Sequence, residues 1–132
     1  MKKIGLLILV LLVLSQFFRP IKNNTPHTNI NTIPEDVKAD LKVACYDCHS
    51  NQTEYPWYSN IQPIAWWMNK HIKNGKQKLN FDDVIKQKRY KDIVETIEEK
   101  EMPLKSYTII HQDANLDVAQ KERIIAWAKS KQ

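Results

Sequence analysis

The chain has few of the residues that small folds use for covalent bridges and tight turns. Its 132 residues include only two cysteines and two glycines. Two cysteines cannot build a disulfide framework, so the protein must be held together by a core to which a cofactor could contribute. The few glycines, and the lack of any sustained alternation of apolar and polar residues, argue against a sheet. We therefore predict an all-α fold.

The charge is also unremarkable in amount and in arrangement. Twenty lysines and arginines face 15 aspartates and glutamates, which gives a formal net charge of +5. These positive residues are scattered along the chain, whereas nucleic-acid binding calls for a basic patch or stripe. We expect no nucleic-acid partner. The length allows one domain and not two.

Both cysteines lie in one short motif, Cys45-Tyr46-Asp47-Cys48-His49. Two cysteines separated by two residues and followed at once by histidine form the attachment pattern of c-type haem. Each thiol can add to one vinyl group of the porphyrin, and the imidazole of His49 then lies beneath the iron. We predict one covalently attached haem c, with Cys45 and Cys48 as attachment sites and His49 as the proximal ligand.

Two other chemistries use the same cysteine spacing. A structural zinc site needs four nitrogen or sulfur ligands, commonly as two closely spaced pairs, and this chain has no second cysteine pair. A thiol-disulfide oxidoreductase could use Cys45 and Cys48, but it has no need of His49. The thiol-disulfide oxidoreductase stays an alternative to the haem protein.

The amino terminus resembles an export signal. Two lysines precede an apolar run from Ile4 to Leu14, and no small-x-small cleavage site follows it. We expect residues 1–19 to be a signal peptide or, more readily, an uncleaved anchor in the cytoplasmic membrane, with residues 20–31 as a linker. The lysines would stay in the cytoplasm, which places a haem-binding domain at 32–132 on the periplasmic side.

Apolar spacing and capping residues predict helices through that domain. We expect helices that begin at Thr32 and at Asn80, a helix over 64–73 that Gly75 ends, one over 90–100, and a last helix that Asp117 caps together with Gln120.

The iron of a haem has a second axial position, and four side chains could fill it: Met68, His71, Met102 and His111. We favour Met102, because Pro103 stiffens the loop around it and it is far from His49 in sequence. His71 is the alternative distal ligand, although it lies on the apolar face of its own expected helix. Met68 suits a core position, and His111 lies in a polar loop where we expect it to be exposed. Trp57 and Trp67 flank the motif closely and are expected to wall the porphyrin.

Several of these motifs together resemble a known family. The haem motif with Ser50-Asn51, then Pro56-Trp57-Tyr58, Leu79-Asn80-Phe81, Glu101-Met102-Pro103 and Ala126-Trp127, is similar to the small bacterial haem-binding domain family and, in its order, to class I cytochromes c. The resemblance covers about residues 37–129. It implies a small cytochrome c-like helical domain around one haem. It also implies the roles of Cys45, Cys48 and His49.

We therefore expect a monohaem c-type cytochrome that passes single electrons between redox partner proteins outside the cytoplasmic membrane. No acid-base pair or activated nucleophile stands beside the motif, so we expect an electron-transfer protein and not an enzyme. A five-coordinate haem enzyme, or a gas or peroxide sensor, is the alternative if Met102 and His71 are both structural.

Overall fold

The computed structural model describes residues 2–22, 24–26 and 31–132. Within them every regular element is helical and no strand occurs, so the predicted all-α fold is confirmed. The elements in chain order are α1 (Lys2–Ser15), α2 (Glu35–Ala44), α3 (Tyr46–His49), η1 (Trp57–Asn60), α4 (Ile64–Lys78), α5 (Gln87–Glu98), α6 (Lys105–Thr108), η2 (Gln112–Ala114) and α7 (Val118–Lys129). His27 and the other linker residues 23 and 28–30 lie outside the described residues.

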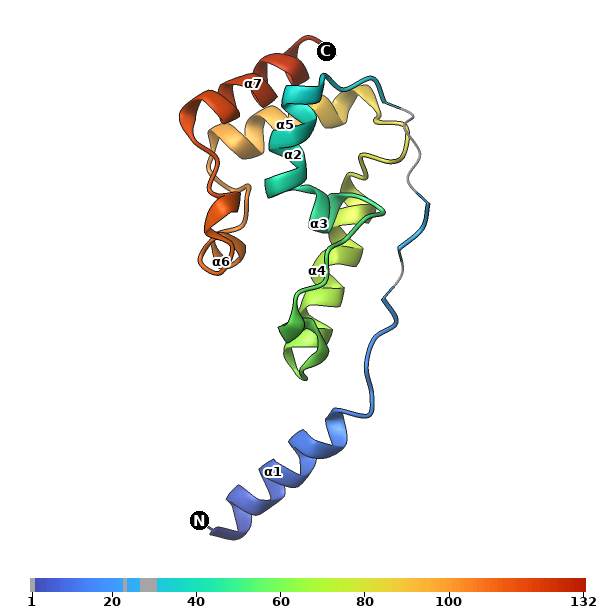
Figure 1. The fold of residues 1–132 in the computed structure, drawn as a ribbon, viewed down its shortest axis with the longest axis vertical. Coiled ribbons are helices and arrows are strands. Elements are labelled where there is room, and N and C mark those ends of the chain that lie inside the picture. Colours follow the sequence, from blue (N-terminus) through green and yellow to red (C-terminus); the bar gives the residue numbers. More distant parts are fainter. Residues whose placement is uncertain (1, 23, 27–30) are drawn as a thin grey trace.

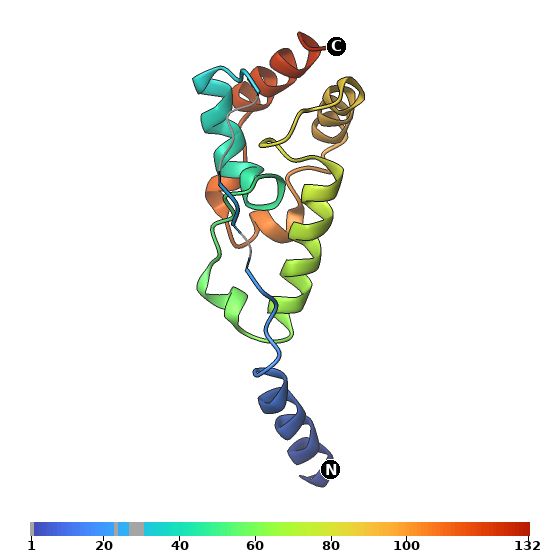
Figure 2. The same ribbon diagram turned by 90° about the vertical axis from the view of Figure 1, so that its right-hand side faces the viewer.

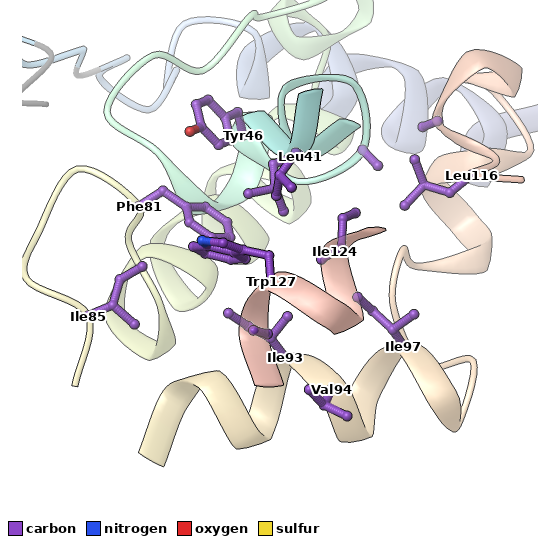
Figure 3. Packing of buried hydrophobic residues seen from close by; sticks show 14 residues of the cluster. Leu41, Tyr46, Phe81, Ile85, Ile93, Val94, Ile97, Leu116, Ile124 and Trp127 are labelled. Carbon is purple, nitrogen blue, oxygen red and sulfur yellow. The ribbon is translucent and has the colours of Figure 1, made fainter. Parts of the chain in front are cut away.

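The core lies where α2, α5 and α7 meet, at the opposite end of the molecule from α1 (Figure 1). Leu41 of α2 and Ile124 of α7 are almost completely buried, and Figure 3 shows both among the clustered apolar side chains. Trp127 of α7 packs edge-on against Tyr90 of α5, with ring centroids 5.5 Å apart. The first and last helices of the domain are therefore joined through one apolar cluster.

The last helix begins as the sequence predicts. The Asp117 side chain accepts the backbone N–H of Gln120, and the Gln120 side chain accepts the backbone N–H of Asp117. This reciprocal pair satisfies two donors that the first helical turn would otherwise leave unpaired. The corresponding prediction for the first helix of the domain is wrong, because α2 is preceded by Pro34 and has no side-chain cap.

Two further predicted helix ends are wrong for reasons that concern packing. Asn80 does not start a helix, because its side-chain oxygen accepts the backbone N–H of Asp82 and closes a local turn. The next helix, α5, begins only at Gln87. Gly75 does not end α4, which continues to Lys78. Gly75 is instead buried inside that helix, where it faces the haem motif.

The amino-terminal segment forms the 14-residue helix α1, and none of its residues is buried. Figures 1 and 2 both show α1 at the end of the molecule that holds η1 and the start of α4, pointing away from the rest of the chain. Among the described residues, no helix is both long and apolar enough to cross a membrane. The anchor that we expected over residues 1–19 stays a prediction.

Candidate functional site

The motif cysteines flank the junction of two helices. Cys45 closes α2, and the next turn, α3, carries Cys48 and His49. The backbone N–H of His49 donates to the Cys45 carbonyl at 2.9 Å, which winds the motif into a single helical turn. Both cysteines are free and half-buried. The tight turn brings the two thiols and the imidazole to one region, as attachment to one ligand requires.

A hydrogen bond to a backbone carbonyl group holds the imidazole of His49 in one orientation. Its Nδ1 lies 2.9 Å from the carbonyl oxygen of Leu79, the residue that follows α4. A carbonyl can only accept a hydrogen bond, so Nδ1 carries the proton and Nε2 keeps its lone pair. Burial lowers the pKa of His49, which also favours the neutral ring. The imidazole is therefore prepared to bind a metal through Nε2.

The thiols have little acidity of their own. Burial raises the pKa of Cys45 to about 12, with a smaller contribution from Cys48. Burial also raises the pKa of Cys48 to about 11, with a smaller contribution from Asp47. Thiol-disulfide oxidoreductases depend on a cysteine whose pKa is lowered toward neutrality. These surroundings are unlike those of a thiol-exchange centre.

A cleft of about 260 Å³ opens beside the motif. Cys45, Cys48 and His49 line it, and so do the two candidate distal ligands, His71 and Met102. The structure thus brings together five residues that are separated by up to 57 positions in the sequence (102 minus 45). The other lining residues are Ala44, Asp47, Asn74, Gly75, Lys78, Pro103, Leu104 and Tyr107.

The two candidate ligands reach the cleft from different elements. His71 lies on α4, where its Nδ1 is 2.9 Å from the carbonyl oxygen of Trp67 and its ring packs on the Trp67 ring at 4.3 Å. The carbonyl can only accept, so Nδ1 is the donor in this contact and Nε2 takes no part in it. Met102 lies in the connection between α5 and α6 and is half-buried. Met68, the third candidate, is not among the described residues that line the cleft.

The two tryptophans that we expected to wall the porphyrin are not among the residues that line the cleft. Trp57 is 75% exposed at the start of η1, and neither it nor Trp67 is among the described residues lining the cleft. Trp67 packs against His71, which does line the cleft. These positions follow from α4, because η1 packs at the start of that helix and the cleft lies toward its end.

Sequence reasoning missed a polar contact in the wall of the cleft. The Tyr107 hydroxyl donates to a carboxylate oxygen of Asp47 at 2.6 Å, and its ring stacks on His111 at 4.3 Å. His111 in turn hydrogen-bonds Tyr58, so it is half-buried and not exposed as we predicted. Asp47 and Tyr107 also line a second cavity of about 620 Å³. They form the partition between the two spaces.

Two other contacts that position the motif also escaped the sequence. The Leu79 carbonyl that holds His49 is a backbone group, which no side-chain pattern reveals. Gly75 gives a weak signal, because glycine in a helix interior is unfavourable and calls for a reason. A Cβ at Gly75 would lie 3.2 Å from the Cβ of Cys48 and closer still to its carbonyl oxygen. The missing side chain lets α4 approach α3.

A family model described as a haem-binding domain matches residues 10–130. Comparison with curated proteins and with solved structures found no match. The donor set fits a haem, since two thiols, a neutral imidazole with a free Nε2 and two candidate sixth ligands share one cleft. A zinc site finds less support, because the described residues hold no group of three or more potential ligands placed to bind a metal.

Proposed function

The chain belongs to the haem-binding domain family, and on that premise we propose that it is a monohaem c-type cytochrome that transfers single electrons outside the cytoplasmic membrane. Cys45 and Cys48 would hold the haem by two thioether bonds, and His49 would bind the iron through Nε2. The bound haem supplies the one-electron chemistry. The observation that carries the proposal is the hydrogen bond from His49 Nδ1 to the Leu79 carbonyl, on the same cleft as both thiols.

The same hydrogen bond supports Met102 as the distal ligand. The Nδ1 edge of His49 faces Leu79 at the end of α4, so its Nε2, which would bind the iron, is directed away from that residue. A distal ligand would come from a part of the chain other than the one that holds His49. Met102 enters the cleft from the α5–α6 connection, and Figure 1 shows α6 well separated from α4. His71 belongs to α4, and the residue that follows this helix, Leu79, already holds His49.

A ligand pair of histidine and methionine has a chemical consequence. Methionine raises the reduction potential relative to a second histidine, and a filled sixth position favours electron transfer over reactions with oxygen or peroxide. The partners would then be redox proteins and not small substrates. Lys78 on the cleft offers an ammonium group for a haem propionate. The leading lysines and apolar run support a location on the outer side of the membrane.

His71 is the second candidate for the distal position, and one observation favours it. Its Nδ1 donates to the Trp67 carbonyl, as Nδ1 of His49 donates to Leu79, so in both residues the contact leaves Nε2 as the nitrogen that could bind a metal. Two histidines would give a low-potential electron carrier. A five-coordinate sensor or enzyme requires that neither His71 nor Met102 bind.

The first experiment is an absorption spectrum of protein produced together with a haem-maturation system, followed by a denaturing gel stained for haem. We expect haem to stay on the chain through denaturation. We also expect a weak band near the red edge of the oxidised spectrum from thioether bound to iron. Loss of haem on the gel would contradict covalent attachment.

Three variants separate the ligands. Met102→Ala should lose the red-edge band and gain reactivity toward carbon monoxide, because it opens the sixth position. Met68→Ala is the matched control, since Met68 is a methionine outside the cleft, and it should keep both the band and the low reactivity. If His71→Ala opens the iron while Met102→Ala leaves the spectrum unchanged, His71 is the ligand. A parent protein that already binds carbon monoxide readily would favour the five-coordinate alternative.

A further inference from the structure

Exposed apolar side chains gather at the end of the molecule opposite the core. They belong to η1, to the residue that follows it and to the first turn of α4. We call this set the tryptophan rim, and it consists of Trp57, Ile61, Ile64, Trp66 and Trp67. The three tryptophans are 75%, 47% and 50% exposed, whereas the remaining tryptophan, Trp127, is 5% exposed in the core. Such a concentration of large apolar side chains marks an interaction surface.

The tryptophan rim is tied to the amino-terminal helix by hydrogen bonds. The backbone carbonyl of Phe18 accepts from the indole N–H of Trp66 and from the side-chain amide of Gln62, both at 2.8 Å. The backbone N–H of Gln62 donates to the side-chain oxygen of Gln16 at 3.0 Å. The segment that leaves α1 is thus fastened to the start of α4. The apolar residues of the tryptophan rim and of α1 therefore lie at the same end of the molecule.

The arrangement of apolar side chains around α1 indicates that lipid, and not a protein, covers this end of the molecule. Apolar side chains of α1 point in every direction and none is buried. A protein partner that met one side would leave the others in water, whereas lipid surrounds a helix on all sides. Tryptophan, with an apolar ring and one N–H donor, concentrates where hydrocarbon meets water. Arg19 and Lys22 lie at the same level, where cations meet anionic headgroups.

We infer that the tryptophan rim rests in the interfacial layer of a lipid bilayer, with α1 embedded in the leaflet beside it. The inference rests on the membrane location in the proposed function but not on haem binding. At 1.5 Å per residue, the 14 residues of α1 extend about 21 Å, short of the roughly 30 Å of a hydrocarbon layer. The tryptophan rim would add apolar contact with the lipid to that made by the short helix α1.

This placement fixes the haem cleft close to the membrane. Figure 2 shows α4 running from the end of the molecule near α1 into the rest of the domain. Its residues His71 and Gly75 line the cleft. Seven residues separate Ile64 from His71 and eleven separate it from Gly75 (71 minus 64, 75 minus 64). With α4 upright, these steps correspond to about 10 Å and 16 Å. The redox partners that can reach the cleft are then those that present their electron-transfer site at the membrane surface.

The test is quenching of tryptophan fluorescence by lipid. Full-length holoprotein variants that keep a single tryptophan, with the other three changed to phenylalanine, are placed in phosphatidylcholine–phosphatidylglycerol vesicles. One set of vesicles carries bromine on the acyl chains, and the other does not. Haem is present in both sets of vesicles, so a difference between the two fluorescence intensities reports contact with the brominated chains, and an unchanged haem spectrum verifies that each variant is folded.

We expect Trp57 and Trp66 each to lose about half or more of their fluorescence in brominated vesicles, because interfacial indoles touch the acyl chains. Trp127, buried in the core, is the matched control and should lose little. A variant lacking all four tryptophans and carrying Leu9→Trp reports on α1. Quenching at Leu9→Trp without quenching at Trp57 and Trp66 overturns the inference but keeps the embedded helix.

Two other outcomes would also overturn it. If neither Leu9→Trp nor the tryptophan rim is quenched, the chain does not enter the bilayer, and the membrane part of the proposed function fails as well. The haem spectrum of the same samples tests the rest of that proposal independently. If the rim tryptophans are shielded from aqueous acrylamide but not quenched by lipid, and the chain crosslinks to itself, a second copy covers the surface.

Discussion

At the scale of single residues, the position of the haem motif depends on a glycine, which has no Cβ atom. Gly75 lies inside α4, where alanine would be the better helix former by about 1 kcal/mol. Its lack of a Cβ lets the backbone of Cys48 lie against the helix. That approach brings Leu79, four residues later, to the imidazole of His49. Glycine at position 75 thus lowers the stability of the isolated helix but allows the close packing that positions the haem motif.

Gly75→Ala should therefore destabilise the protein despite its better helix propensity. Overpacking against the Cys48 backbone costs about 1–3 kcal/mol, and subtracting the gain in propensity leaves a net loss on the order of 1 kcal/mol. Urea unfolding of the holoprotein measures the loss. Gln77→Ala, at an exposed position of the same helix, should not lower the midpoint. Equal midpoints for Gly75→Ala and the parent would show that α3 and α4 do not need this close approach.

At the scale of elements, one buried carboxylate joins the first and last helices of the domain. Asp40 of α2 is 4% exposed and accepts two hydrogen bonds from the Arg123 guanidinium of α7, at 2.9 Å and 3.1 Å. The side-chain amide of Gln120 donates a third at 3.0 Å. The hydrogen bonds to Arg123 hold the pKa of Asp40 below its usual value. Charge and apolar packing thus act together where α2 meets α7.

This carboxylate predicts a pH dependence of stability. A lowered pKa in the folded state stabilises the protein fully above the unfolded value of about 3.9. That stabilisation is lost as the pH falls through the lower folded value, where the parent carboxyl is protonated. Asp40→Asn should therefore cost about 1–2 kcal/mol at pH 6, and the difference from the parent should shrink steadily below about pH 4.

Unfolding by urea at several pH values measures that difference. Glu98→Gln provides the control, because Glu98 pairs with Lys129 in an exposed ion pair and should contribute little. A difference between Asp40→Asn and the parent that stayed constant from pH 6 to pH 3 would show that the charge of Asp40 is not what joins the two helices.

At the scale of the whole molecule, the cleft lies beside the apolar core, and a haem bound in it would enlarge the buried interior. The apolar cluster gathers around α2, α5 and α7, whereas α3, the end of α4 and residues 102–107 face the cleft. A domain of this size has little core to spare, and burying a haem adds to it. Binding to the folded state alone also stabilises that state.

Protein made without haem maturation, and the His49→Ala variant, should therefore be markedly less stable than the holoprotein. A loss of about 3 kcal/mol lowers the melting temperature of a domain of this size by roughly 12–24 °C. Thermal unfolding followed by circular dichroism measures the shift. Met68→Ala, which alters no residue of the cleft, should keep most of the stability. A haem-free protein as stable as the holoprotein would mean that the cleft is preformed and the haem an addition to it.

The sequence alone determined the features that depend on neighbouring residues. The haem motif is a local spacing of Cys45, Cys48 and His49, and the all-α fold follows from helical apolar periods with few glycines. The Asp117–Gln120 capping box is likewise set by residues three apart, and the structure confirms it. Local chemistry of this kind does not depend on what the rest of the chain does.

Only the tertiary structure decided what surrounds the motif. It placed Met102 and His71 on the cleft and put Tyr107 against Asp47. It left Trp57 exposed near the start of α4, away from the cleft. It also set the Leu79 carbonyl behind His49. These contacts join residues up to 60 positions apart. They are fixed by how closely helices can pack, and sequence periodicity carries no record of which side chain or backbone carbonyl will face another across that distance.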